Sequence, residues 1–121
     1  MLISTRPTLS TETTADGADV LTLDGDFELA HAPGVGHRLA DLLSGCEGDL
    51  IVDLRGVSFL DSKTLRILLI ALRHADSLGC QLVLVRPNAH VWRVFEVVGF
   101  DQLFPSFASL REATSSLAAP A

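Results

Sequence analysis

A serine stands where a predicted strand gives way to a predicted helix, in the stretch Asp61-Ser62-Lys63-Thr64-Leu65. The first N–H groups of an α-helix have no partner inside the helix, and the helix dipole makes this end positive. A phosphate group is therefore stabilised at such a position. Asp61 is a residue type typical of the N-cap. The sequence thus places a hydroxyl where negative charge is electrostatically favourable.

The elements on either side of this junction should hold the hydroxyl in place. Residues 50–54 form an apolar, β-rich run that indicates a buried strand, which Arg55 and Gly56 should end. The helix after Asp61 should run to about Ser77, because its leucines recur on one face and Leu78-Gly79 follows. The junction is therefore expected to lie between two buried elements.

The rest of the chain predicts an α/β fold, a mixed sheet of four to five strands with about four helices packed on it. We expect a hairpin over 8–14 and 18–25, helices over 32–45, 89–98 and 109–117, a strand over 80–85, and a short strand or turn over 100–104. The first strand is polar on both faces and should lie at an edge. The 121 residues predict a single domain over 1–121, with a core over about 8–115 and frayed ends over 1–6 and 118–121.

Composition narrows the classes of function. The 48% hydrophobic content excludes a disordered chain, and the net charge of −6 argues against nucleic acid as a partner. No apolar run reaches the roughly 18 residues of a membrane span, and the N-terminus lacks the pattern of a signal peptide. We therefore expect a cytoplasmic protein without a membrane partner.

The sequence contains no motif that indicates a cofactor or a metal site. The chain has no P-loop, and its histidines lack ligand spacing, so we expect no metal and no cofactor. The histidines are His31, His37, His74 and His90. The two cysteines, Cys46 and Cys80, favour buried free thiols over a disulfide if the protein is cytosolic.

Three stretches resemble the STAS family, named for sulfate transporters and anti-sigma factor antagonists. The run Ile51-Val52-Asp53-Leu54-Arg55-Gly56-Val57-Ser58-Phe59-Leu60-Asp61 and the serine after it are similar to the family's strand and Asp-Ser motif. The stretch 25–29 is similar to the family's Gly-Glu-Leu-Asp, and 91–104 is similar to its last helix and the turn beyond it. Together they cover roughly residues 8–115, in the family's order and spacing.

The resemblance implies an anti-sigma factor antagonist that regulates transcription, as in bacterial stress responses, and is not an enzyme. In such proteins the unphosphorylated form binds an anti-sigma factor that is also a serine kinase. By resemblance, phosphorylation of Ser62 would release that partner and a phosphatase would restore binding. A monomer or weak dimer is expected.

The residues around Ser62 have more than one interpretation. Asp61 is an N-cap, a contact for Ser62 or a partner, or both. Lys63 stands where the family has a small or hydroxyl residue, and it would either pair with a phosphate or be solvated. Thr64 stands where the family has glycine and would present a branched group to the partner. By resemblance Asp26 and Glu28 lie on a loop beside the serine, as solvated acids or as an acidic patch for a basic partner.

Two other functions remain open on the sequence alone. One is a scaffold subunit of a larger stress-sensing assembly, since some STAS proteins act in this way. The other is a small serine hydrolase in which Ser62 acts with Asp61 and a histidine. This enzyme would need a histidine near Ser62 and an oxyanion site.

Overall fold

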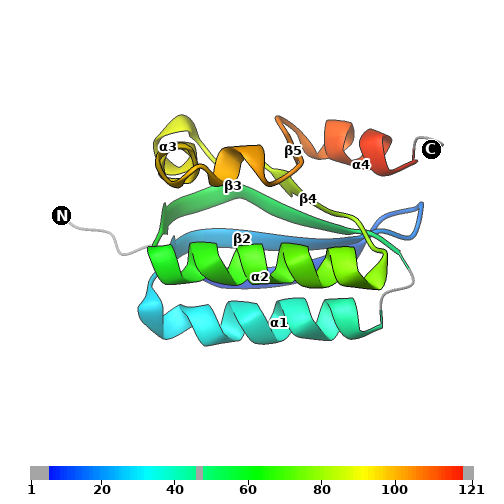
Figure 1. The fold of residues 1–121 in the computed structure, drawn as a ribbon, viewed down its shortest axis with the longest axis horizontal. Coiled ribbons are helices and arrows are strands. Elements are labelled where there is room, and N and C mark those ends of the chain that lie inside the picture. Colours follow the sequence, from blue (N-terminus) through cyan, green and yellow to red (C-terminus); the bar gives the residue numbers. More distant parts are fainter. Residues whose placement is uncertain (1–5, 46–47, 119–121) are drawn as a thin grey trace.

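The computed structural model describes residues 6–45 and 48–118, which form a mixed sheet with helices on both sides (Figure 1). The five strands are β1 (Thr8–Thr13), β2 (Asp19–Phe27), β3 (Leu50–Leu60), β4 (Leu82–Val85) and β5 (Ser106–Phe107). They lie side by side in chain order, with β1 antiparallel to β2 and every other neighbouring pair parallel. This arrangement confirms the predicted fold class, with the polar strand β1 at an edge.

The helices form two layers. The α-helices are α1 (Ala32–Ser44), α2 (Ser62–Leu78), α3 (Ala89–Val98) and α4 (Leu110–Ala118), and the short 3₁₀ helices are η1 (Leu29–His31) and η2 (Phe100–Gln102). In Figure 1, α1 and α2 run side by side below the sheet, whereas α3, η2 and α4 lie above it. The layer of α1 and α2 therefore has one face on the sheet and one face directed outward.

The core explains why these helices lie where they do. The face of α2 that carries Leu65, Leu68 and Leu72 is buried, and it joins a cluster that includes the buried Leu39 of α1 and Leu54 of β3. Two helix ends follow their residue types. Asn88 caps α3 by accepting a hydrogen bond from the Val91 N–H at 3.0 Å, and Gly79 ends α2 with φ +76°.

Strand β3 differs from the prediction because Arg55 and Gly56 do not end it. The strand continues to Leu60, and its pairing with β2 shifts register between Thr22 and Asp24. A Cβ atom at Gly56 would collide with the Asp24 carboxylate, so glycine is the residue that allows this passage. The bulged strand thereby carries the chain directly to the start of α2.

Strand β3 also contains a buried carboxylate, Asp53, that is only 4% exposed. Arg55 binds it through Nη2 at 2.7 Å and Nε at 3.0 Å, and the Arg55 backbone N–H donates to it as well. These hydrogen bonds, and then the charge of Asp53, raise the pKa of Arg55 above its usual value. Arg55 thus compensates the burial of Asp53 rather than marking the end of the strand.

Three smaller predictions have different outcomes. The segment over 100–104 begins with a 3₁₀ helix, and the terminal strand comes after Pro105 as β5. Cys80 is disulfide-bonded, so the prediction of a free thiol there is wrong, while Cys46 lies outside the described residues. Of the ends predicted to fray, 1–6 and 118–121, residues 1–5 and 119–121 lie outside the described part, whereas Ala118 is the last residue of α4.

Candidate functional site

The junction between β3 and α2 has the geometry that the residue types predict. Asp61 is in an extended conformation, and its carboxylate accepts a hydrogen bond from the Thr64 N–H at 2.9 Å. Its carbonyl accepts the first bond of the helix, from the Leu65 N–H at 3.1 Å. Ser62 is the first residue of α2, and its side chain is exposed. The hydroxyl of Ser62 therefore lies at the surface, at the positive end of a 17-residue helix.

Thr64 does not belong to this exposed set. Its side chain has 0% exposure, and its Oγ1 has no hydrogen-bond partner among the described residues. The expectation that Thr64 presents a branched group to a partner is therefore wrong, because no partner atom reaches a fully buried side chain. Position 64 lies one helical turn before Leu68 and thus on the buried face of α2.

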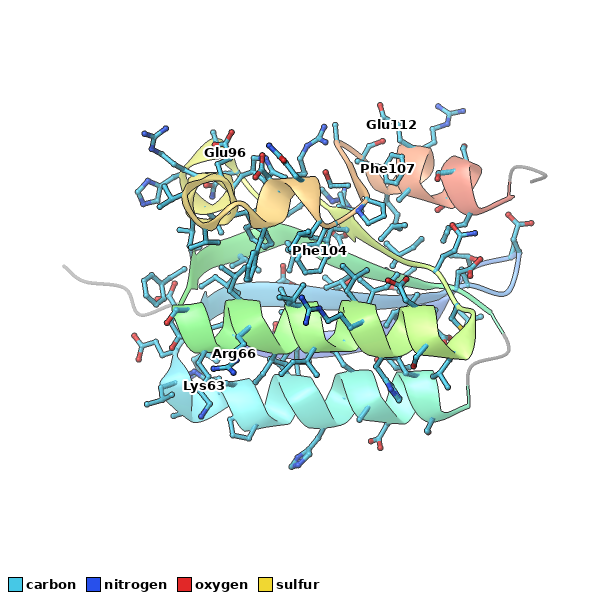
Figure 2. The ribbon with its side chains drawn as sticks, viewed as in Figure 1. Lys63, Arg66, Glu96, Phe104, Phe107 and Glu112 are labelled. Atoms are coloured by element: carbon cyan, nitrogen blue, oxygen red, sulfur yellow. The ribbon has the colours of Figure 1, made fainter. Side chains whose placement is uncertain are left out.

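Two cations lie next to Ser62. Lys63 and Arg66 are both exposed, and Figure 2 shows them in the first turns of α2, in the strip between α2 and α1. Both line a surface hollow that Ser62 also lines. Arg66 was not among the predicted site residues, although its spacing of four from Ser62 places the two side chains on one face of the helix.

The end of β2 meets the same junction. The Asp61 N–H donates to the Phe27 carbonyl at 3.1 Å, and the Phe27 side chain is buried in the core. Glu28 follows at an exposed position that begins η1, and its N–H donates to Nδ1 of His31 at 3.3 Å. The backbone hydrogen bond thus places the end of β2 beside the N-cap of α2.

The position of Asp26 differs from the prediction of a loop residue. It belongs to strand β2 rather than to a loop, and it pairs with Phe59 in β3. Its carboxylate is partly buried and accepts a hydrogen bond from the Ser58 hydroxyl at 2.6 Å. Asp26 therefore links β2 to β3 and is not a solvated loop acid.

Other chemistry finds little support at this junction. Among the described residues, no hydrogen bond joins Ser62 to a histidine. Over all the residues that the structure describes, no three His, Cys, Asp or Glu side chains are placed to hold a metal ion. Nor is any described helix long and apolar enough to cross a membrane. What the junction offers is an exposed hydroxyl beside two cations.

Comparison with known proteins shows the family of this chain. The family profile described as "Mlab, STAS domain" matches residues 10–112, which is most of the chain. The chain belongs to the STAS domain family. A relative in Bordetella bronchiseptica bears the name "Putative anti-sigma factor antagonist BtrV". It is 31% identical over 101 residues, covering 84% of this chain and 86% of BtrV.

Solved structures share the STAS fold. An anti-sigma factor antagonist from Mycobacterium paratuberculosis is 24% identical with a TM-score of 0.81, covering 97% of this chain and 100% of that one. The unphosphorylated form of SpoIIAA is 18% identical with a TM-score of 0.80, covering 94% and 99%. The phosphorylated form of SpoIIAA, a Bacillus cell fate determinant, has a TM-score of 0.70 at 18% identity, covering 90% and 98%. At these identities the likeness concerns the fold.

Proposed function

We propose that this STAS protein is a cytoplasmic anti-sigma factor antagonist that is switched by phosphorylation of Ser62. The unphosphorylated form binds an anti-sigma factor with serine kinase activity, and this binding frees the sigma factor. Phosphorylation of Ser62 releases the partner, and a phosphatase restores binding. The observation that carries the proposal is the exposed hydroxyl of Ser62 at the first position of α2, directly after the capping Asp61.

The physical effect of the modification supports this switch. A phosphate adds about −1.5 to −2 charges and three acceptor oxygens at pH 7. The helix N-terminus and the neighbouring Lys63 stabilise that charge, whereas Asp61 opposes it. The fold should therefore tolerate the modification while the surface around residue 62 changes from neutral to strongly negative. A partner packed on this surface in the unphosphorylated state would meet a bulky anion.

Phosphopeptide mapping tests the modification directly. The protein is incubated with ATP and the anti-sigma factor kinases of its own cell, and its intact mass and phosphopeptides are then measured. We expect one phosphate, confined to Ser62. Ser58 and Ser77 provide controls within the chain, because both are exposed but their hydroxyls donate to Asp26 and to the His74 carbonyl respectively. Modification at either of them with Ser62 untouched would contradict the proposal.

Titration calorimetry with the kinase that modifies Ser62 tests the switch. Ser62→Ala should bind this partner whether or not ATP is present, because it has no hydroxyl to phosphorylate. Ser62→Asp should bind at least about tenfold more weakly, since a charge is introduced at the contact. Ser58→Ala is the matched control and should bind and be phosphorylated like the wild type. Equal affinity of the alanine and aspartate variants would remove Ser62 from the interface.

A further inference from the structure

The outward face of the α1–α2 layer carries an apolar groove that leads to the site. One wall is formed by α1, with Gly36 and Ala40, and the other by α2, with Ile67 and Ile70. The groove has a volume of about 180 Å³, and Ile70 is 58% exposed. The same two isoleucines also line the hollow that contains Ser62. The groove and the site are therefore one continuous surface, which we call the α1–α2 groove.

The shape of the α1–α2 groove suits a helix. Gly36 has no side chain, and a Cβ atom there would lie 3.6 Å from Ile67, at van der Waals contact. Glycine therefore leaves open space beside Ile67 that a larger residue would fill. Side-chain ridges of one helix pack into the grooves on the surface of another, so an open apolar groove between two helices can receive a third. From Lys63 to His74 the exposed edge of α2 extends over roughly 16 Å, the length of three helical turns.

The charge of this layer is opposite to that of the protein. Helices α1 and α2 together contain four Lys or Arg and two Asp or Glu. The whole chain contains nine and 15. Among the described residues the ion pair found is that of Asp53 with Arg55, so Lys63, Arg66 and Arg73 have no carboxylate partner there. Of these cations, Lys63 and Arg66 line the hollow at one end of the groove, so an acidic protein exposes two unpaired cations beside an apolar surface.

We propose that the α1–α2 groove binds an acidic amphipathic helix of a partner protein. The apolar face of that helix covers Ile67 and Ile70, and its carboxylates pair with Lys63 and Arg66. A second copy of this chain is disfavoured as the occupant, because pairing groove on groove brings like charges together. The inference rests on the proposed function for its regulation: a phosphate on Ser62 takes the same two cations and repels the acidic helix.

NMR titration of the labelled protein tests the inference with designed peptides. The first probe is a peptide of about 18 residues, with leucine at spacings of three and four and glutamate between, because shorter isolated helices are marginal in water. The second has lysine in place of each glutamate. We expect the acidic peptide to shift amide resonances over 36–43 and 63–74, with an affinity that falls as salt rises. The basic peptide should leave these resonances unchanged.

Variants divide the groove into its apolar and charged parts. Ile70→Glu should lower the affinity for the acidic peptide by about tenfold or more, because a repulsive charge replaces an aliphatic contact. The double variant Lys63→Gln/Arg66→Gln should lower this affinity by about threefold to tenfold and make it less dependent on salt. Val97→Glu is the matched control, since Val97 is 74% exposed on α3 and outside the groove. It should bind like the wild type.

Several results would overturn the inference. The two peptides could bind equally, Ile70→Glu could bind the acidic peptide with wild-type affinity, or the resonance shifts could be centred on α3. Shifts over 36–43 and 63–74 that depend only on protein concentration would instead show that the groove binds a second copy of the chain. The mapping of phosphate to Ser62 is independent of all of them. If the kinases phosphorylate Ser62 but the unphosphorylated protein binds no acidic peptide, the groove alone is refuted. If the protein binds the acidic peptide but no kinase phosphorylates Ser62, the switch alone is refuted.

Discussion

The two faces of α2 have opposite properties over the same few turns. Ser62 and Thr64 are both hydroxyl residues, two positions apart, yet the first is exposed and the second is fully buried. Ile70 and Leu68 are a similar pair of aliphatic residues, 58% and 0% exposed. The inner face therefore holds the helix on the sheet, and the outer face is left for recognition. Substitutions on the two faces should change different measured quantities.

The largest expected effect lies on the inner face. Leu68→Ala removes a fully buried side chain and should lower the free energy of unfolding by about 3 kcal/mol, because it loses apolar contacts and leaves a cavity. Urea denaturation followed by circular dichroism measures this change. Ile70→Ala on the outer face is the control and should change the same quantity by less than about 0.5 kcal/mol. Similar losses in both variants would mean that Ile70 is also a core residue.

Thr64 offers a smaller effect of opposite sign. Its buried Oγ1 lacks a hydrogen-bond partner among the described residues, and such a group costs about 1–3 kcal/mol. Thr64→Val keeps the shape and removes the hydroxyl, so the free energy of unfolding should rise by about 1 kcal/mol. Thermal and urea denaturation of both proteins give the difference.

Thr64→Ser provides the control for this prediction. It keeps the hydroxyl and loses a methyl group, so it should be no more stable than the wild type. A Thr64→Val protein that is less stable than the wild type would show that the hydroxyl has a stabilising partner. In either case the binding of the acidic peptide to the outer face should not change.

The sequence predicts local structure well where one residue decides it. The Asp61 cap and the glycine that ends α2 follow from backbone chemistry within a few positions, and the structure has both. The leucine spacing of α2 likewise predicts which face is buried. Because of that periodicity, the burial of Thr64 could have been inferred from its spacing of four to Leu68.

Contacts between distant segments could not be predicted in this way. Asp24 occupies the space beside Gly56, and the Ser58 hydroxyl bonds to Asp26 across 32 positions of sequence. Both depend on the shifted register of β2 and β3, which no local pattern encodes. For the same reason, the α1–α2 groove becomes visible only when Gly36 and Ile67 are seen to face each other.

The smallest expected effect concerns the stability of the phosphorylated protein. A phosphate on Ser62 lies at the positive end of α2 and four residues before Arg66, so it should raise the free energy of unfolding by about 0.3–1 kcal/mol at low salt. Denaturation of the protein before and after phosphorylation, with the modification verified by mass, measures the change. Arg66→Gln should reduce the gain, and high salt should reduce it in both proteins. A loss of stability on phosphorylation would mean that repulsion by Asp61 exceeds both attractions, and the phosphate would then act by disturbing the start of α2 rather than by charging an intact surface.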